Sequence, residues 1–140
     1  MKTISKILLA AFIISGTVLS SCSKYEEGPK LSLRSKKARL AGKWTFEKAL
    51  VNGADQTSAY ALFLGGITFE YTKDGKYTNT SSAGSETGTW EFINDKEDVK
   101  TLSSIAGSTP DTMHIIKLKN KELWTKEVSG STTTELHFKQ

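Results

Sequence analysis

Hydrophobic and polar residues alternate in short runs from Gly42 to the end of the chain. In residues 43–50, Trp44, Phe46 and Leu50 fall on one face, and in residues 67–72 Phe69 shares a face with Tyr71. A period of two in aromatic and β-branched residues is typical of strands with one buried face. Six further runs follow, at 76–80, 89–92, 98–103, 113–118, 122–128 and 132–139.

Turn signals separate these runs. Asp74-Gly75 is a two-residue hairpin signal, and further turns are expected at Ala83-Gly84, Asn94-Asp95, Pro110-Asp111, Lys119-Asn120 and Ser129-Gly130. Strands joined in order by tight turns pair antiparallel, and eight of them can close without exposed edges. The pattern therefore predicts an all-β fold, an eight-stranded antiparallel up-and-down barrel. A flattened or incompletely closed barrel is the alternative, because residues 98–103 alternate weakly.

Two segments outside the strands are compatible with short helices. The basic run 36–40 leads into the first strand, and there Leu33 and Leu40 are expected to plug one end of the barrel. The second segment, residues 58–64, lies in the long connection after the first strand and is expected to cap an open end.

Gly42-Lys43-Trp44 resembles the G-x-W signature on the first strand of the lipocalins and related calycins. Together with Gly88-Thr89-Trp90-Glu91-Phe92 and Leu136-His137-Phe138, it is similar to the lipocalin-like lipoproteins of the Bacteroidetes, over residues 38–140. The resemblance implies that Trp44 closes the barrel floor, where lipocalins commonly cover it with a late arginine. The only arginines here, Arg34 and Arg39, precede the barrel, so either Arg39 or Lys139 is expected to replace it.

Residues 1–21 have the organisation of a secretory signal peptide. Lys2 and Lys6 precede an apolar stretch at 7–19, which is shorter than the roughly 20 residues a membrane-spanning helix needs. Leu19-Ser20-Ser21-Cys22 follows and resembles the bacterial lipobox, which implies acylation of Cys22 by chains such as palmitate and a membrane anchor. The alternative is a buried free thiol. Cys22 is the only cysteine, so disulfides and multi-thiolate metal sites are excluded.

Residues 22–37 are polar and contain Gly28-Pro29, so they are expected to form a tether. Lys24 followed by Glu26-Glu27 resembles a surface-export signal of Bacteroidetes lipoproteins, although any solvated tether could carry such charges. We expect an outer-membrane lipid-anchored protein facing the periplasm or the cell surface. Removal of residues 1–21 lowers the net charge from +4 to +2, so the basic composition is no argument for nucleic acid binding.

The barrel interior is the candidate ligand site. A small hydrophobic or amphipathic ligand would contact aromatic walls, which the pattern assigns to Trp44, Phe69, Tyr71, Tyr77, Trp90, Phe92 and Trp124. The alternative, favoured for most of these side chains, is that they simply fill the interior. A barrel with a filled core would instead serve as a protein-interaction module, such as a protease inhibitor or a subunit of a surface complex.

No catalytic or cofactor motif accompanies this pattern. His114 is expected to be a hydrogen-bonded strand histidine and His137 to be solvated, and two histidines without a spaced carboxylate or thiolate make a poor metal site. The nucleophile motif G-x-S-x-G and a phosphate-binding loop are absent. We therefore expect no enzyme activity, cofactor or metal. Asp111-Thr112-Met113 resembles a short O-glycosylation sequon, which would place a glycan on Thr112 in an exposed turn.

Overall fold

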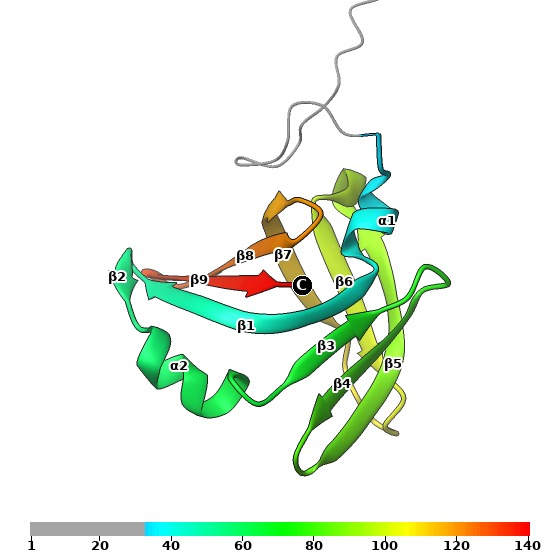
Figure 1. Cartoon of the computed structure of the whole chain (residues 1–140), viewed down its shortest axis with the longest axis horizontal. Helices are drawn as coiled ribbons and strands as arrows, with labels where there is room; N and C mark the ends of the chain where they lie inside the picture. The colour runs from blue at the N-terminus through cyan, green and yellow to red at the C-terminus, as the bar shows by residue number, and fades with distance from the viewer. Residues whose placement is uncertain (1–32) are drawn as a thin grey trace, which may run out of the picture.

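The computed structural model describes residues 33–140; the predicted signal peptide, Cys22 and most of the tether lie outside the described residues. The described chain consists mainly of strands with three short helical segments (Figure 1). In order they are α1 (Lys36–Leu40), β1 (Gly42–Val51), β2 (Ala54–Asp55), α2 (Thr57–Leu64), β3 (Thr68–Tyr71), β4 (Lys76–Ser81), β5 (Gly84–Ile93), η1 (Asn94–Lys96), β6 (Asp98–Ser103), β7 (Asp111–Leu118), β8 (Glu122–Ser129) and β9 (Thr132–Lys139).

The strands form a closed barrel. From β3 to β9 each strand pairs antiparallel with the next, β1 pairs with β3, and β9 returns to pair with β1. The two-residue β2 only extends the end of β1, so eight strands make the barrel and the predicted fold class is confirmed. The weakly patterned run forms β6, which is paired on both sides. Its alternation is weak because Leu102 points to solvent while Val99 is fully buried.

The two ends of the barrel differ in what covers them. Helix α1 lies at the end where β1 begins, together with the β3–β4 turn, η1 and the β7–β8 turn; we call this the closed end. Helix α2, the β6–β7 loop and the β4–β5 and β8–β9 turns lie at the other end, which we call the open end (Figure 1). Both predicted short helices are therefore present.

Helix α1 plugs the closed end. Ser35 caps its N-terminus by accepting a hydrogen bond from the Ala38 amide at 3.1 Å, and Leu40 is fully buried in the hydrophobic core. The expected contribution of Leu33 is wrong. This residue precedes the helix cap and its side chain is fully exposed.

Arg39 covers the closed end from the same helix. Its guanidinium is buried, and Nη1 donates a hydrogen bond to the Leu118 carbonyl at 2.9 Å. Lys139, the alternative, extends from the outer surface and pairs with Glu47 at 3.6 Å. Of the two cations proposed from the sequence, the buried one is therefore Arg39, which reaches the barrel floor from the beginning of the domain.

Helix α2 lies beside the far end of β1. The Ala49 amide donates to the Thr57 hydroxyl at 3.2 Å, and the Gln56 amide donates to the Ala49 carbonyl at 2.9 Å. No residue of the helix is buried, and Leu62 and Phe63 are 83% and 77% exposed. The helix therefore adds apolar surface near the open end without sealing it.

Candidate functional site

A cavity of about 740 Å³ occupies the open half of the barrel. Its floor is aromatic and aliphatic, formed by Trp44, Tyr71, Tyr77, Leu123 and Phe138. Towards the open end the lining becomes small or polar, with Asn79, Thr101, Ser103, Thr125 and Thr134. Short side chains at inward-facing positions leave the centre of the barrel unfilled, which is the physical origin of the cavity.

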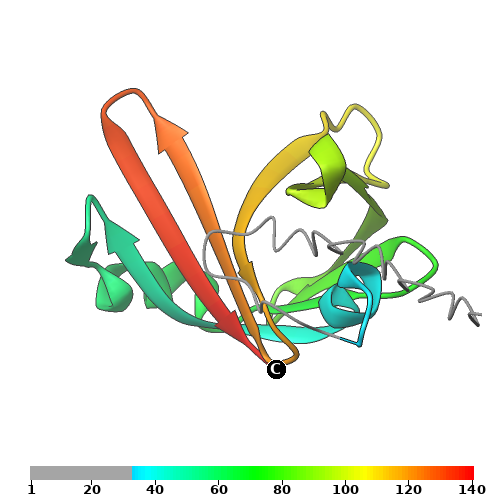
Figure 2. The ribbon, with the colours of Figure 1, turned by 90° about the horizontal axis from the view of Figure 1, so that it is seen from above.

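The cavity extends sideways between β7 and β8. These strands pair from Leu118 opposite Leu123 only as far as His114 opposite Lys126, so the first residues of β7 have no partner on β8. Beyond that point the β8–β9 hairpin diverges from β7 (Figure 2). Thr112 and Glu127 line the cavity on the two sides of this opening.

Four of the seven aromatic residues predicted to contact a ligand line the cavity, namely Trp44, Phe69, Tyr71 and Tyr77. Trp90 and Phe92 lie in the closed half, where their rings meet edge to face with centroids 5.3 Å apart. The Trp90 indole also donates to the Thr72 carbonyl at 3.0 Å. These two side chains fill the core, as the alternative interpretation expects, so the barrel has a filled closed half and a hollow open half.

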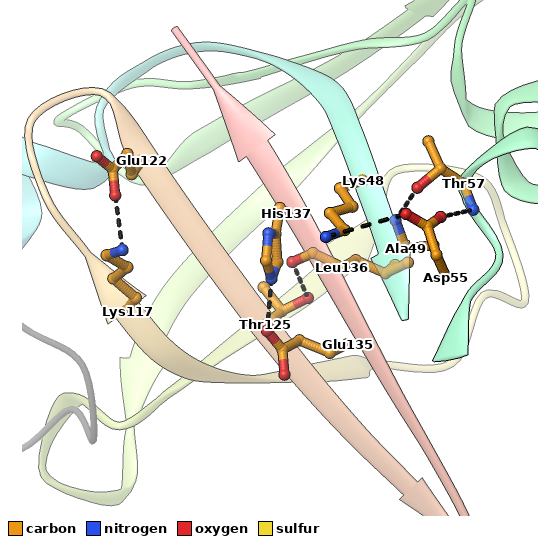
Figure 3. Close-up of polar contacts among 10 residues, drawn as sticks. All are labelled: Lys48, Ala49, Asp55, Thr57, Lys117, Glu122, Thr125, Glu135, Leu136 and His137. Carbon is orange, nitrogen blue, oxygen red and sulfur yellow. Dashed lines mark hydrogen bonds and ion pairs between the residues drawn. The ribbon is translucent and has the colours of Figure 1, made fainter. Parts of the chain in front are cut away.

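Trp124 lies on the outer surface of the barrel, in line with Lys117 and His137 on the neighbouring strands. Its ring stacks on His137 with centroids 3.9 Å apart and planes within 2°, and the Lys117 ammonium lies 3.4 Å from the ring centroid of Trp124. Lys117 also pairs with Glu122 at 2.8 Å (Figure 3).

The prediction that His137 is solvated is wrong. It does face outwards, but the residue is only 7% exposed because the Trp124 ring stacks on it. Its Nε2 lies 2.5 Å from a carboxylate oxygen of Glu135, two residues earlier on the same strand (Figure 3). The strand period correctly gave the face of this residue, whereas its burial depends on a neighbour from β8.

A solved structure identifies the fold. No family model and no curated protein matches the sequence. Among solved structures, a lipocalin-like protein from Bacteroides uniformis ATCC 8492 superposes with a TM-score of 0.52 at 15% identity, covering 73% of this chain and 98% of the other. The fold is lipocalin-like. A DUF4847 family protein from Bacteroides vulgatus ATCC 8482 also matches, with a TM-score of 0.48 and 12% identity over 74% of this chain and 95% of that one. The superposition on the Bacteroides uniformis structure confirms, for the fold, the resemblance inferred from the sequence.

Polar groups in the lipocalin-like barrel gather on β4 and β5. The Tyr77 hydroxyl donates to the Glu86 carboxylate at 2.8 Å, and Asn79 lies directly opposite Glu86 across the two strands. Burial raises the pKa of Tyr77, and the hydrogen bond to Glu86 raises it further. Burial likewise raises the pKa of Tyr71 far above its ordinary value, so both phenols are neutral.

Sequence reasoning missed the polar side of this site. Asn79, Glu86, Ser103 and Asp111 line the cavity but were absent from the predicted site. The signal was available for Asn79, because the strand period places it on the same face as Tyr77. For Glu86 and Asp111 it was not, because β5 begins five residues, and β7 two residues, before the predicted apolar alternation.

The remaining predicted positions lie away from the floor of the cavity. His114 is hydrogen-bonded as predicted, with Nδ1 2.6 Å from an Asp98 carboxylate oxygen. Thr112 is exposed, but it is the second residue of β7 and not part of a turn, because Asp111 already pairs with Thr101. Within residues 33–140, no three His, Cys, Asp or Glu side chains group as metal ligands, and no helix is long and apolar enough to cross a membrane.

Proposed function

We propose that this chain is a non-catalytic binding protein that holds a small amphipathic ligand in the open half of its barrel. The cavity carries the proposal. Its volume of about 740 Å³ lies within the roughly 300–1,000 Å³ typical of small-molecule sites. The aromatic floor around Trp44 and Tyr71 suits an apolar moiety, and the polar lining towards the mouth suits a head group near solvent.

The absence of catalysis belongs to the same proposal. Neither histidine of the chain lines the cavity, and the serines that do, Ser103 and Ser108, therefore have no imidazole base within it. The Glu86 carboxylate accepts a hydrogen bond from Tyr77. This lining provides contacts for binding and holds no nucleophile–base pair.

A fluorescent apolar probe tests the binding function. We expect N-phenyl-1-naphthylamine to bind the purified protein with increased emission. Thr134→Trp, which fills the cavity from β9, should weaken binding about ten-fold or more. Thr133→Trp is the matched control, because the adjacent residue faces outwards and should leave the affinity unchanged within about two-fold. No binding, or equal effects of the two substitutions, would contradict the proposal.

The predicted lipid anchor fits this arrangement. If Cys22 is acylated, the chain enters the barrel through α1 at the closed end, and the cavity mouth lies at the opposite end. Access for a ligand is then from the side away from the tether. Cys22→Ser should abolish incorporation of labelled palmitate in cells and shift the protein out of the membrane fraction. Retained labelling would refute the anchor.

A second function, recognition of a protein partner, is favoured by exposed apolar side chains near the open end. Leu62 and Phe63 of α2, Ile105 of the β6–β7 loop and Val128 of β8 are all exposed. Exposed apolar patches of this kind often mark interaction surfaces. Affinity capture from outer-membrane extracts should recover a stoichiometric protein that Leu62→Ser with Phe63→Ser releases. Recovery of no such protein would count against this function.

A further inference from the structure

On β4 and β5 the cavity wall carries two hydrogen-bond acceptor groups, the Glu86 carboxylate and the Asn79 side-chain oxygen. The Tyr77 hydroxyl has a single proton, which it donates to Glu86 at 2.8 Å. The Tyr77 oxygen is also hydrogen-bonded by Ser103, so towards the cavity the carboxylate oxygens of Glu86 are left as acceptors. Both residues line the cavity.

Asn79 adds an acceptor with no partner. Its side-chain oxygen Oδ1 is buried and makes no hydrogen bond to any residue in the described part of the chain. Asn79 lines the cavity directly opposite Glu86. Because an unsatisfied buried acceptor is unfavourable, a ligand that donates a hydrogen bond here would be stabilised.

The charge balance of the lining is negative. Asp111, at the start of β7, lines the cavity two strands away from β5, and its charge contributes to the raised pKa of Tyr71 after burial and the neighbouring Tyr77. Three carboxylates, Glu86, Asp111 and Glu127, line the cavity, against one ammonium, Lys126. Glu86 is half-buried opposite Asn79, whereas Asp111 and Glu127 are exposed towards the open end.

From this wall we infer that the cavity selects amphiphiles whose head group donates hydrogen bonds, with a protonated primary amine bound most tightly. This inference rests on the proposed binding function. An ammonium group would donate to Asn79 Oδ1 and the Glu86 carboxylate while its alkyl chain occupies the aromatic floor. A carboxylate head would be repelled by Glu86 and Asp111 and cannot donate to the Asn79 oxygen.

Three amphiphiles with equal chains separate the alternatives: decylamine, decanol and decanoate, titrated calorimetrically below their micellar concentrations into the purified full chain. We expect decylamine to bind most tightly, decanol next and decanoate at least about ten-fold more weakly than decylamine. If decanol binds and decylamine shows no advantage over decanoate, the head-group inference fails and the binding function stands. If none of the three binds, both fail.

Substitutions of Glu86 and Asn79 test whether these residues cause the preference for an amine head group. Glu86→Gln should weaken decylamine binding about ten-fold and change decanol binding by no more than about two-fold. Glu91→Gln is the matched control on the same strand, because Glu91 is exposed on the outer surface and pairs with Lys100 at 3.1 Å. Asn79→Leu is a second variant, to be used if Glu86→Gln fails to fold. It removes the Asn79 side-chain oxygen that has no hydrogen-bond partner and buries no new polar group. Equal decylamine affinity in Asn79→Leu and the unmodified protein would overturn the inference.

Discussion

The indole nitrogen of Trp44 donates a hydrogen bond to the carbonyl of Leu40 at 2.8 Å, and both residues are fully buried. This bond joins the first strand to the last residue of α1. Ala41, between the helix and the strand, donates its amide to the Lys37 carbonyl at 3.1 Å. The contact between α1 and β1 at the closed end is therefore made by residues close together in sequence.

The leucine of this pair should contribute strongly to stability. Leu40→Ala removes a fully buried side chain from the core cluster and leaves a cavity beneath Trp44. We expect the free energy of unfolding in urea to fall by about 2–5 kcal/mol. Leu62→Ala is the control, because Leu62 is exposed on α2, and its effect should stay within about 0.5 kcal/mol. Similar effects of both would show that α1 does not plug the barrel.

Arg39 should stabilise the same end through its buried hydrogen bond. Arg39→Met keeps much of the side-chain volume but leaves the Leu118 carbonyl without its guanidinium donor. The expected loss is about 1.5–3 kcal/mol in urea unfolding. Arg34→Met is the control, since Arg34 is exposed and its bond to the Ala38 carbonyl lies at the surface. An unchanged midpoint in Arg39→Met would mean that the floor needs no cation.

Gly88 allows close packing of Tyr77 against β5. A Cβ atom at position 88 would lie 2.4 Å from the Tyr77 ring and 2.2 Å from the Leu102 carbonyl oxygen. Gly88→Ala should therefore destabilise the protein by about 1–3 kcal/mol. A Cβ at Gly66 meets no atom within 4 Å, so Gly66→Ala should change stability by no more than about 0.5 kcal/mol. Chemical denaturation of both variants measures the difference.

The Lys117–Glu122 pair predicts a pH-dependent contribution to stability. A hydrogen bond from Lys117 lowers the pKa of Glu122 below its ordinary 4.5. A carboxylate with a lowered pKa in the folded state stabilises the protein above the unfolded value, and this contribution is lost as the pH falls through the folded pKa. Glu122→Gln should thus reduce stability at pH 7 by about 1 kcal/mol.

The difference between Glu122→Gln and the unmodified protein should shrink as the pH falls below 4.5. Urea unfolding at a series of pH values from 7 to about 3 measures it. Glu91→Gln, on the exposed surface, should change stability at pH 7 by no more than about 0.5 kcal/mol. A Glu122→Gln difference that is constant across this range would exclude the ion pair as its source.

Local patterns were sufficient to predict the strands, and therefore the barrel, because period-two alternation and turn residues act over a few positions. The run 98–103 formed β6 although Leu102 obscured its pattern. The predicted ends of the strands were less accurate than their order. Strand β5 begins at Gly84, five residues before the apolar alternation, because its first half faces the polar part of the cavity.

The candidate site was only partly accessible from sequence. Trp44, Phe69, Tyr71 and Tyr77 were predicted and line the cavity. Trp124 carries the same aromatic signal but lies on the outer surface, stacked on His137. A sequence pattern shows which residues share a face of a strand. Whether a side chain on that face is buried depends on the residues of the neighbouring strands.

The sequence by itself determined the fold class, the order of the strands and the two short helices, because these follow from contacts between near neighbours. Only the tertiary structure decided that Arg39 covers the floor, that the open half is hollow, and that Glu86 and Asp111 line it. These features depend on pairing register and on the divergence of β8 from β7. Both arise from residues distant in the chain, and no local period encodes them.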